Sequence, residues 1–153
     1  MQDWNYISDS VMGGVSIGAI IREPFQGKIA TRLYGQVSMD NDGGFLQMAF
    51  NLDKNDGIFN AASWTGLEID LIGNNEEYDI RLRTDELNRP WQSFRKTFLA
   101  PREWIKARVP FADLQSHRTK LKFKPNRLRR IGILAIGREF KADIAVAAIR
   151  FYQ

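Results

Sequence analysis

Hydrophobic and polar residues alternate with a period of two along most of this chain, and that period is typical of β-strands with one buried face. In residues 66–72 the apolar side chains Leu67, Ile69 and Leu71 alternate with two carboxylates. Residues 78–83 repeat the pattern, with three apolar side chains between one aspartate and two arginines. The alternation predicts that each segment turns one face to a core and the other to solvent.

Turn-forming Gly, Pro, Asn and Asp residues divide the chain into about ten such segments. The predicted strands cover residues 15–21, 28–37, 45–50, 66–72, 78–83, 92–99, 103–109, 120–124, 130–136 and 142–152. The segment 130–136 is apolar on both sides, which predicts a central strand. No segment carries a helical period over a comparable length. We therefore expect an all-β sandwich or barrel, formed by residues 1–153 as a single domain.

Composition removes several classes of chemistry. The 153 residues include no cysteine and a single histidine, His117, which excludes disulfides, thiolate catalysis and the common zinc and copper sites. The sequence therefore predicts no metal and no cofactor. Its first residues resemble no secretory signal, and no apolar run is long enough to span a membrane. We expect a cytoplasmic protein.

The net charge of +4 is unevenly distributed. Seven cations lie between residues 118 and 130: Arg118, Lys120, Lys122, Lys124, Arg127, Arg129 and Arg130. Such a run is typical of a solvated face, and an anionic partner is the alternative. Nucleic acid is not the favoured partner, because Phe123 is the only aromatic residue within the run.

The stretch from Asp9 to Ser16 combines a carboxylate, two hydroxyls and the adjacent glycines Gly13 and Gly14. It contains neither Gly-x-Ser-x-Gly nor a phosphate-binding glycine pattern, and His117 is expected in an exposed loop. The sequence therefore predicts no catalytic residue here. We expect Asp9, Ser10 and Ser16 to hydrogen-bond to backbone groups, while Met12, Gly13 and Gly14 shape the loop.

Two other groups of carboxylates could carry chemistry. The stretch 40–44 has the character of a calcium loop, but the twelfth position of the calcium pattern is Asn51 and not glutamate, so a metal-free turn is favoured. Glu68 and Asp70 share one face of a strand, as a glycosidase pair would. If the segments 66–72 and 78–83 pair, Arg81 and Arg83 lie beside these carboxylates, and ion pairing is then the favoured interpretation.

Trp91 is the aromatic residue whose polar neighbours in the sequence most strongly suggest a position at the protein surface. It follows Arg89-Pro90 and precedes Gln92. An exposed tryptophan beside arginine and glutamine could stack on a sugar or anchor a protein interface. A tryptophan that caps the core is the alternative, and the sequence leaves both open.

Short motifs occur in a fixed order along almost the whole chain. They are Trp4, Asp9-Ser10-Val11-Met12-Gly13-Gly14 with Ser16, Phe25-x-Gly27, Gly43-Gly44-Phe45, Gly66-Leu67, Tyr78-x-Ile80-x-Leu82-Arg83, Trp91, Trp104 and Val109-Pro110-Phe111. This series resembles the complex I intermediate-associated protein family. The best-known members of that family are mitochondrial assembly factors for NADH:ubiquinone oxidoreductase.

The resemblance implies a galactose-binding-like jelly-roll β-sandwich with a non-catalytic role in binding or assembly. The chain lacks the N-terminal extension of mitochondrial relatives, which implies a stand-alone, bacterial-type member. We expect a protein partner, bound by Asp9, Ser10, Arg81, Arg83 and Trp91. A carbohydrate-binding module is the alternative, and a glycosidase that uses Glu68 and Asp70 is a more remote one.

Overall fold

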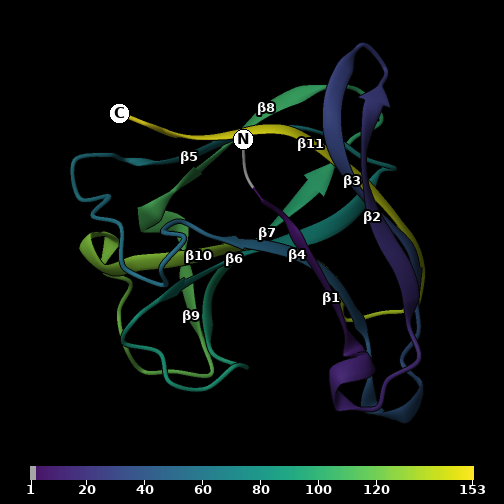
Figure 1. The fold of residues 1–153 in the computed structure, drawn as a ribbon, viewed down its shortest axis with the longest axis horizontal. Coiled ribbons are helices and arrows are strands. Elements are labelled where there is room, and N and C mark those ends of the chain that lie inside the picture. The colour runs from purple at the N-terminus through teal and green to yellow at the C-terminus, as the bar shows by residue number, and fades with distance from the viewer. Residues whose placement is uncertain (1–2) are drawn as a thin grey trace.

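Two antiparallel β-sheets packed against each other form the protein in a computed structural model that describes residues 3–153 (Figure 1). One sheet has six strands in the order β1 (Asn5–Ser8), β4 (Phe45–Asn51), β10 (Leu128–Ile136), β6 (Glu76–Thr84), β7 (Ser93–Ala100) and β9 (Gln115–His117). The other has five strands in the order β2 (Ile17–Phe25), β3 (Lys28–Val37), β11 (Phe140–Tyr152), β5 (Gly66–Ile72) and β8 (Ile105–Pro110).

Short 3-10 helices lie in the connections between strands. They are η1 (Asp9–Met12), η2 (Asp40–Asp42), η3 (Phe111–Asp113) and η4 (Pro125–Arg127). None of the helices within residues 3–153 is long and apolar enough to cross a membrane.

The inward faces of the two sheets supply one continuous core. Leu67, Ile69 and Leu71 of β5 are fully buried, and so are Ile80 and Leu82 of β6 on the opposite sheet. Burial of a side chain of this size stabilises a fold by about 1.5–3 kcal/mol. The alternation in the sequence therefore marks the buried faces correctly, and the prediction of an all-β sandwich is confirmed.

The predicted pairing of segments 66–72 and 78–83 is wrong. Strand β5 pairs with β11 and β8, whereas β6 pairs with β10 and β7, so the two segments belong to different sheets. The turn at residues 73–75 carries the chain from one sheet to the other. Alternation identifies which face of a strand is buried, but it does not identify the neighbouring strand, and here the two apolar faces meet across the core.

The predicted strand at residues 120–124 is also absent. Residues 118–124 are irregular, and the short strand β9 just before them pairs with β7. Phe123 packs on Phe94 and Phe111, with ring centroids 5.3 and 5.2 Å away, so the alternating pattern reflects one buried aromatic ring among solvated lysines. Strand β1 was not predicted at all, because the pattern of residues 5–8 is too short to stand out.

Part of the basic run is neutralised by carboxylates. Lys124 pairs with Glu86 at 3.1 Å, Arg127 with Asp85 at 2.5 Å and Arg129 with Asp56 at 3.9 Å. These pairs fit the interpretation of the run as a solvated face.

The carboxylate of Asp9 joins three segments at one end of the sandwich. Asp9 is fully buried and accepts hydrogen bonds from Ser16 Oγ at 2.6 Å, Ser16 N at 3.0 Å, Gly44 N at 2.6 Å and Phe45 N at 3.3 Å. Burial alone raises the pKa of this carboxyl, but the hydrogen bonds together outweigh it and hold the pKa below its ordinary value. The ionised carboxylate thus fastens η1 to the starts of β2 and β4.

The glycines of this end make room for the carboxylate. A Cβ on Gly14 or on Gly43 would overlap the Asp9 side chain. Gly13 ends η1 with φ +86°, in the left-handed region that glycine adopts without strain. The two Gly-Gly pairs of the sequence, at residues 13–14 and 43–44, therefore meet at the Asp9 side chain. A side chain at Gly14 or Gly43 would occupy the space of the carboxylate.

We predict that Asp9→Asn destabilises the protein by about 2–4 kcal/mol, because an amide loses the charge-assisted bonds and turns its own N–H toward backbone donors. Urea unfolding of the purified protein measures the change. Asp40→Asn is the matched control, since Asp40 is exposed and lies in the neighbouring turn. An equal effect of the two substitutions would contradict the role of Asp9.

We also predict that this destabilisation depends on pH. The pKa of Asp9 is lowered from 3.8 in the folded protein, so the ionised group contributes its full stabilisation above about pH 4 and loses it as the pH falls through the folded-state value. The difference in unfolding free energy between wild type and Asp9→Asn should be largest above about pH 5 and should shrink as the pH is lowered from about pH 5 to about pH 2. A constant difference across that range would show that the charge of Asp9 does not matter.

Candidate binding groove

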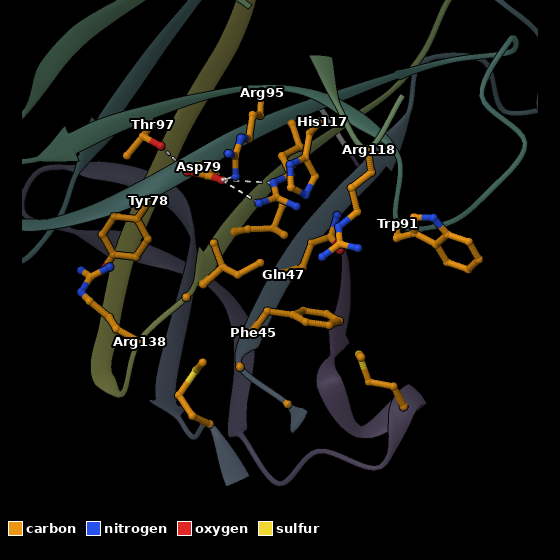
Figure 2. Close-up of a pocket in the computed structure, with 18 of the residues that line it drawn as sticks. Phe45, Gln47, Tyr78, Asp79, Trp91, Arg95, Thr97, His117, Arg118 and Arg138 are labelled. Carbon is orange, nitrogen blue, oxygen red and sulfur yellow. Dashed lines mark hydrogen bonds and ion pairs between the residues drawn. The ribbon is translucent and has the colours of Figure 1, made fainter. Parts of the chain in front are cut away.

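A groove of about 760 Å³ runs across the outer face of the six-stranded sheet (Figure 2). Strands β4, β10, β6 and β7 form its floor with the side chains that alternate with core residues, such as Gln47, Leu134, Asp79 and Thr97. Loops and the 3-10 helices of the Asp9 end form its rim. On β4 and β6 the groove therefore occupies the face that carries the polar side chains, whereas β10 contributes the apolar Leu134 and Ile136.

Asp79 is the central charge of the floor. It accepts bonds from Arg81 Nη2 at 2.8 Å, Arg81 Nε at 3.1 Å and Thr97 Oγ1 at 2.7 Å, and Arg95 Nη1 lies 4.0 Å away. Arg81 and Arg95 are directly opposite each other on β6 and β7. One carboxylate thus hydrogen-bonds Arg81, forms a longer ion pair with Arg95, and has both of its oxygens occupied by Arg81 and Thr97.

His117 lies beside this cluster on β9. It is half-buried and lines the groove, so the expectation of an exposed loop residue is wrong. Burial, followed by the charges of Arg81, Arg95 and Arg118, lowers the pKa of the imidazole, and Asp79 opposes the shift. The imidazole is therefore neutral at physiological pH and offers one donor and one acceptor.

The rim carries exposed apolar side chains. Met12 of η1 is 58% exposed, Met39 beside η2 is 44% exposed and Trp91 is 56% exposed. All three line the groove. Trp91 projects at one end in Figure 2, and the alternative of a core-capping tryptophan is excluded. The Asp9 carboxylate, which fixes η1 and the start of β4, indirectly sets the methionine side of this rim.

The opposite end of the groove is braced to the other sheet. Tyr78 donates its hydroxyl to Asn74 Oδ1 at 2.6 Å and accepts from the backbone N–H of Asp143 at 2.9 Å. Burial raises the pKa of Tyr78 to about 12. Arg138 lies beside Tyr78 in Figure 2, pairs with Glu76 at 2.8 Å and covers the ring of Phe140. This end therefore keeps a fixed shape.

Arg83 holds the loop that carries Trp91. Its Nη1 donates to the carbonyl oxygens of Arg89 at 2.8 Å and Gln92 at 2.5 Å. Arg83 itself lines two smaller cavities next to the groove. The loop conformation, and with it the position of Trp91, thus depends on a guanidinium group from the neighbouring strand.

The predicted site residues fall into two sets. Arg81, Trp91 and Met12 line the groove and Arg83 adjoins it. Asp9, Gly13, Gly14 and Ser16 lie outside the lining of the groove, and Ser10 is exposed in η1, where its backbone N–H is capped by Ser8 Oγ at 3.2 Å. The carboxylate oxygens of Asp9 are occupied inside the protein, so we propose that its contribution is to shape the rim.

Several residues that line the groove were not predicted as site residues from the sequence. Gln47 and Asp79 were identifiable as outward-facing, but nothing in the sequence marks them as neighbours. Arg95, His117, Arg118 and Arg138 reach the groove only through the strand order and the loops at its ends. Their long separation along the chain leaves no local signal.

Glu68 and Asp70 lie on the other sheet and line none of the three cavities described. Arg150 binds both carboxylates, Arg108 binds Glu68 at 2.9 Å and Lys106 binds Asp70 at 3.3 Å. Arg108 and Arg150 lower the pKa of Glu68, and Arg150 and Lys106 lower that of Asp70. Both are therefore ionised and paired, which argues against a general acid, although the cations differ from those that the sequence suggested.

Solved structures with the same fold include carbohydrate-binding modules. A family 11 module from Clostridium thermocellum, in complex with a β-1,3-1,4-mixed-linked tetrasaccharide, matches with a TM-score of 0.78 at 10% identity over 99% of this chain and 89% of its own. A family 30 module matches with a TM-score of 0.69 at 14% identity over 97% and 82%. At these identities the likeness establishes the β-sandwich fold alone.

An exo-β-agarase matches with a TM-score of 0.61 at 8% identity, over 97% of this chain and 23% of the agarase. A comparison with curated proteins gave no significant match.

The family resemblance is confirmed by a family model. The model described as complex I intermediate-associated protein 30 (CIA30) matches residues 1–145, which include the Asp9 end, the groove strands and the first part of β11. The match covers nearly the whole sandwich, and the chain therefore belongs to the complex I intermediate-associated protein 30 family.

Proposed function

We propose that the protein is a non-catalytic module that binds a protein partner through the groove of the six-stranded sheet. The observation that carries this proposal is the combination of an exposed apolar rim, made by Met12, Met39 and Trp91, with a floor rich in guanidinium groups. Tryptophan and arginine are the residues that most often dominate protein interfaces. Methionine adapts its shape to an apolar partner surface.

The apolar surface extends beyond the rim itself. Val11, next to Met12 in η1, is 75% exposed. Several large exposed apolar side chains along the rim of a groove mark an interaction surface, because solvent exposure of such a surface is unfavourable. A partner with apolar side chains for the rim and carboxylates for the arginines fits this arrangement.

The family and the chemistry of the floor support a binding role. The family description names an association with complex I intermediates, which supports an assembly-factor-like role. Asp79 is occupied by Arg81 and Thr97, and no hydrogen bond joins it to His117 within residues 3–153. The groove thus lacks a carboxylate–histidine pair arranged for proton transfer.

We predict that the double substitution Met12→Ser and Trp91→Ala reduces capture of groove-dependent partners at least about tenfold, as expected for the loss of interface anchors. Quantitative mass spectrometry of proteins retained by the purified, tagged chain measures it. Ile29→Ser is the matched control, since Ile29 is exposed on β3 of the other sheet. Proteins retained equally by all three chains would count against the groove as the partner site.

A carbohydrate ligand is the second candidate. It is supported by the exposed position of Trp91 at the rim of the groove and by the bound tetrasaccharide of the structural neighbour. Stacking of a sugar on Trp91 would contribute through the face of the indole ring.

Calorimetric titration with a β-1,3-1,4-linked tetrasaccharide, together with a glycan array, tests this candidate. Binding that is lost in Trp91→Ala and retained in Tyr34→Ala, an exposed aromatic control on β3, would establish it. A blank array and no heat with the wild-type chain would remove it.

A further inference from the structure

Two arginines face each other on the outer surface of the six-stranded sheet, next to the groove. Arg83 of β6 and Arg130 of β10 are directly opposite in the strand register. Side chains at such positions have their Cβ atoms about 4.5–5.5 Å apart, and like charges there destabilise a sheet. Both arginines are half-buried, which reduces screening of the repulsion by water.

No carboxylate forms an ion pair with either arginine within residues 3–153. Arg83 uses Nη1 for the loop carbonyls, and Arg130 uses Nη1 for Asn51 Oδ1 at 3.3 Å. In that part of the chain, Nε and Nη2 of both groups have no acceptor. Several donors of the pair thus remain available.

The same sheet contains a second facing pair that is compensated. Arg81 and Arg95 are also directly opposite, but Asp79 Oδ2 accepts hydrogen bonds from Nε and Nη2 of Arg81 and lies 4.0 Å from Arg95 Nη1. The comparison shows what the Arg83–Arg130 pair lacks. The chain supplies an anion at one pair and not at the other.

A cavity of about 440 Å³ opens beside the uncompensated pair. Its charged lining consists of Arg83, Arg129 and Arg130 against the single carboxylate of Asp56, which lies 3.9 Å from Arg129 and accepts a bond from Asn51. Burial, followed by the neighbouring arginine charges, lowers the pKa of Arg83 and of Arg130. The cavity therefore has room for a ligand and an excess of positive charge.

We propose that the Arg83–Arg130 cavity binds an oxyanion, either a carboxylate or a phosphate group, which takes the place that Asp79 occupies at the Arg81–Arg95 pair. Planar guanidinium groups bind both kinds of oxyanion through two parallel hydrogen bonds. The proposal does not depend on the function of the groove, because neither Arg83 nor Arg130 lines the groove and no protein partner is needed.

Calorimetric titration of the purified chain at low ionic strength, with inorganic phosphate in one arm and glutarate in the other, tests the proposal. Saturable binding is expected in at least one arm, and the arm that responds identifies the class of oxyanion. Arg130→Gln should weaken it at least about tenfold through loss of charge-assisted donors, whereas Arg22→Gln, which removes an exposed cation from β2, should change it less than about twofold.

Thermal unfolding gives a second readout that separates binding from damage to the fold. Without an oxyanion, Arg130→Gln should unfold at the same temperature as wild type or higher, because repulsion from Arg83 is relieved. At one oxyanion concentration, the unfolding temperature of wild type and of Arg22→Gln should rise by the same amount, and that of Arg130→Gln should rise by clearly less. No saturable binding by wild type in either arm, or equal binding by both variants, would overturn the proposal.

Discussion

The hydrogen-bonded, buried carboxylate of Asp9 is the interaction on which one end of this sandwich depends. A charge without a cation is tolerated inside a protein only when hydrogen bonds replace its water, and here Ser16, Gly44 and Phe45 provide them. These donors belong to segments that would otherwise be loosely attached ends of strands. The carboxylate thus converts an N-terminal stretch into a fixed rim.

The outer faces of the two sheets differ in how far their arginines are paired with carboxylates. On the five-stranded sheet, two clusters pair arginines with carboxylates, Arg150 with Glu68 and Asp70, and Arg32 with Asp143. On the six-stranded sheet, Asp79 is shared by two arginines, and the Arg83–Arg130 pair has no carboxylate. Uncompensated positive charge and the apolar rim thus lie on the same face of the sandwich, the one that carries the groove.

The strand order explains why the groove could be anticipated only in part. Alternation placed Arg81 on an outer face, and the context of Trp91 suggested exposure. The sequence also suggested that Arg81 would neutralise Glu68 and Asp70, which in fact lie on the opposite side of the molecule. Asp79 and His117 come together because β6, β7 and β9 are consecutive in the sheet, a long-range property that no local pattern contains.

The amino-acid sequence by itself determined the all-β class, the buried face of most strands and the family. The fold class and the buried faces depend on the two-residue period, and the family depends on short motifs such as Asp9-Ser10-Val11-Met12-Gly13-Gly14. Both are local properties of the chain. The pairing of strands, the partners of each charge and the groove were decided only by the tertiary structure. The physical reason is that any strand with one apolar face can cover the core from either sheet, and packing of the whole sandwich selects its neighbours.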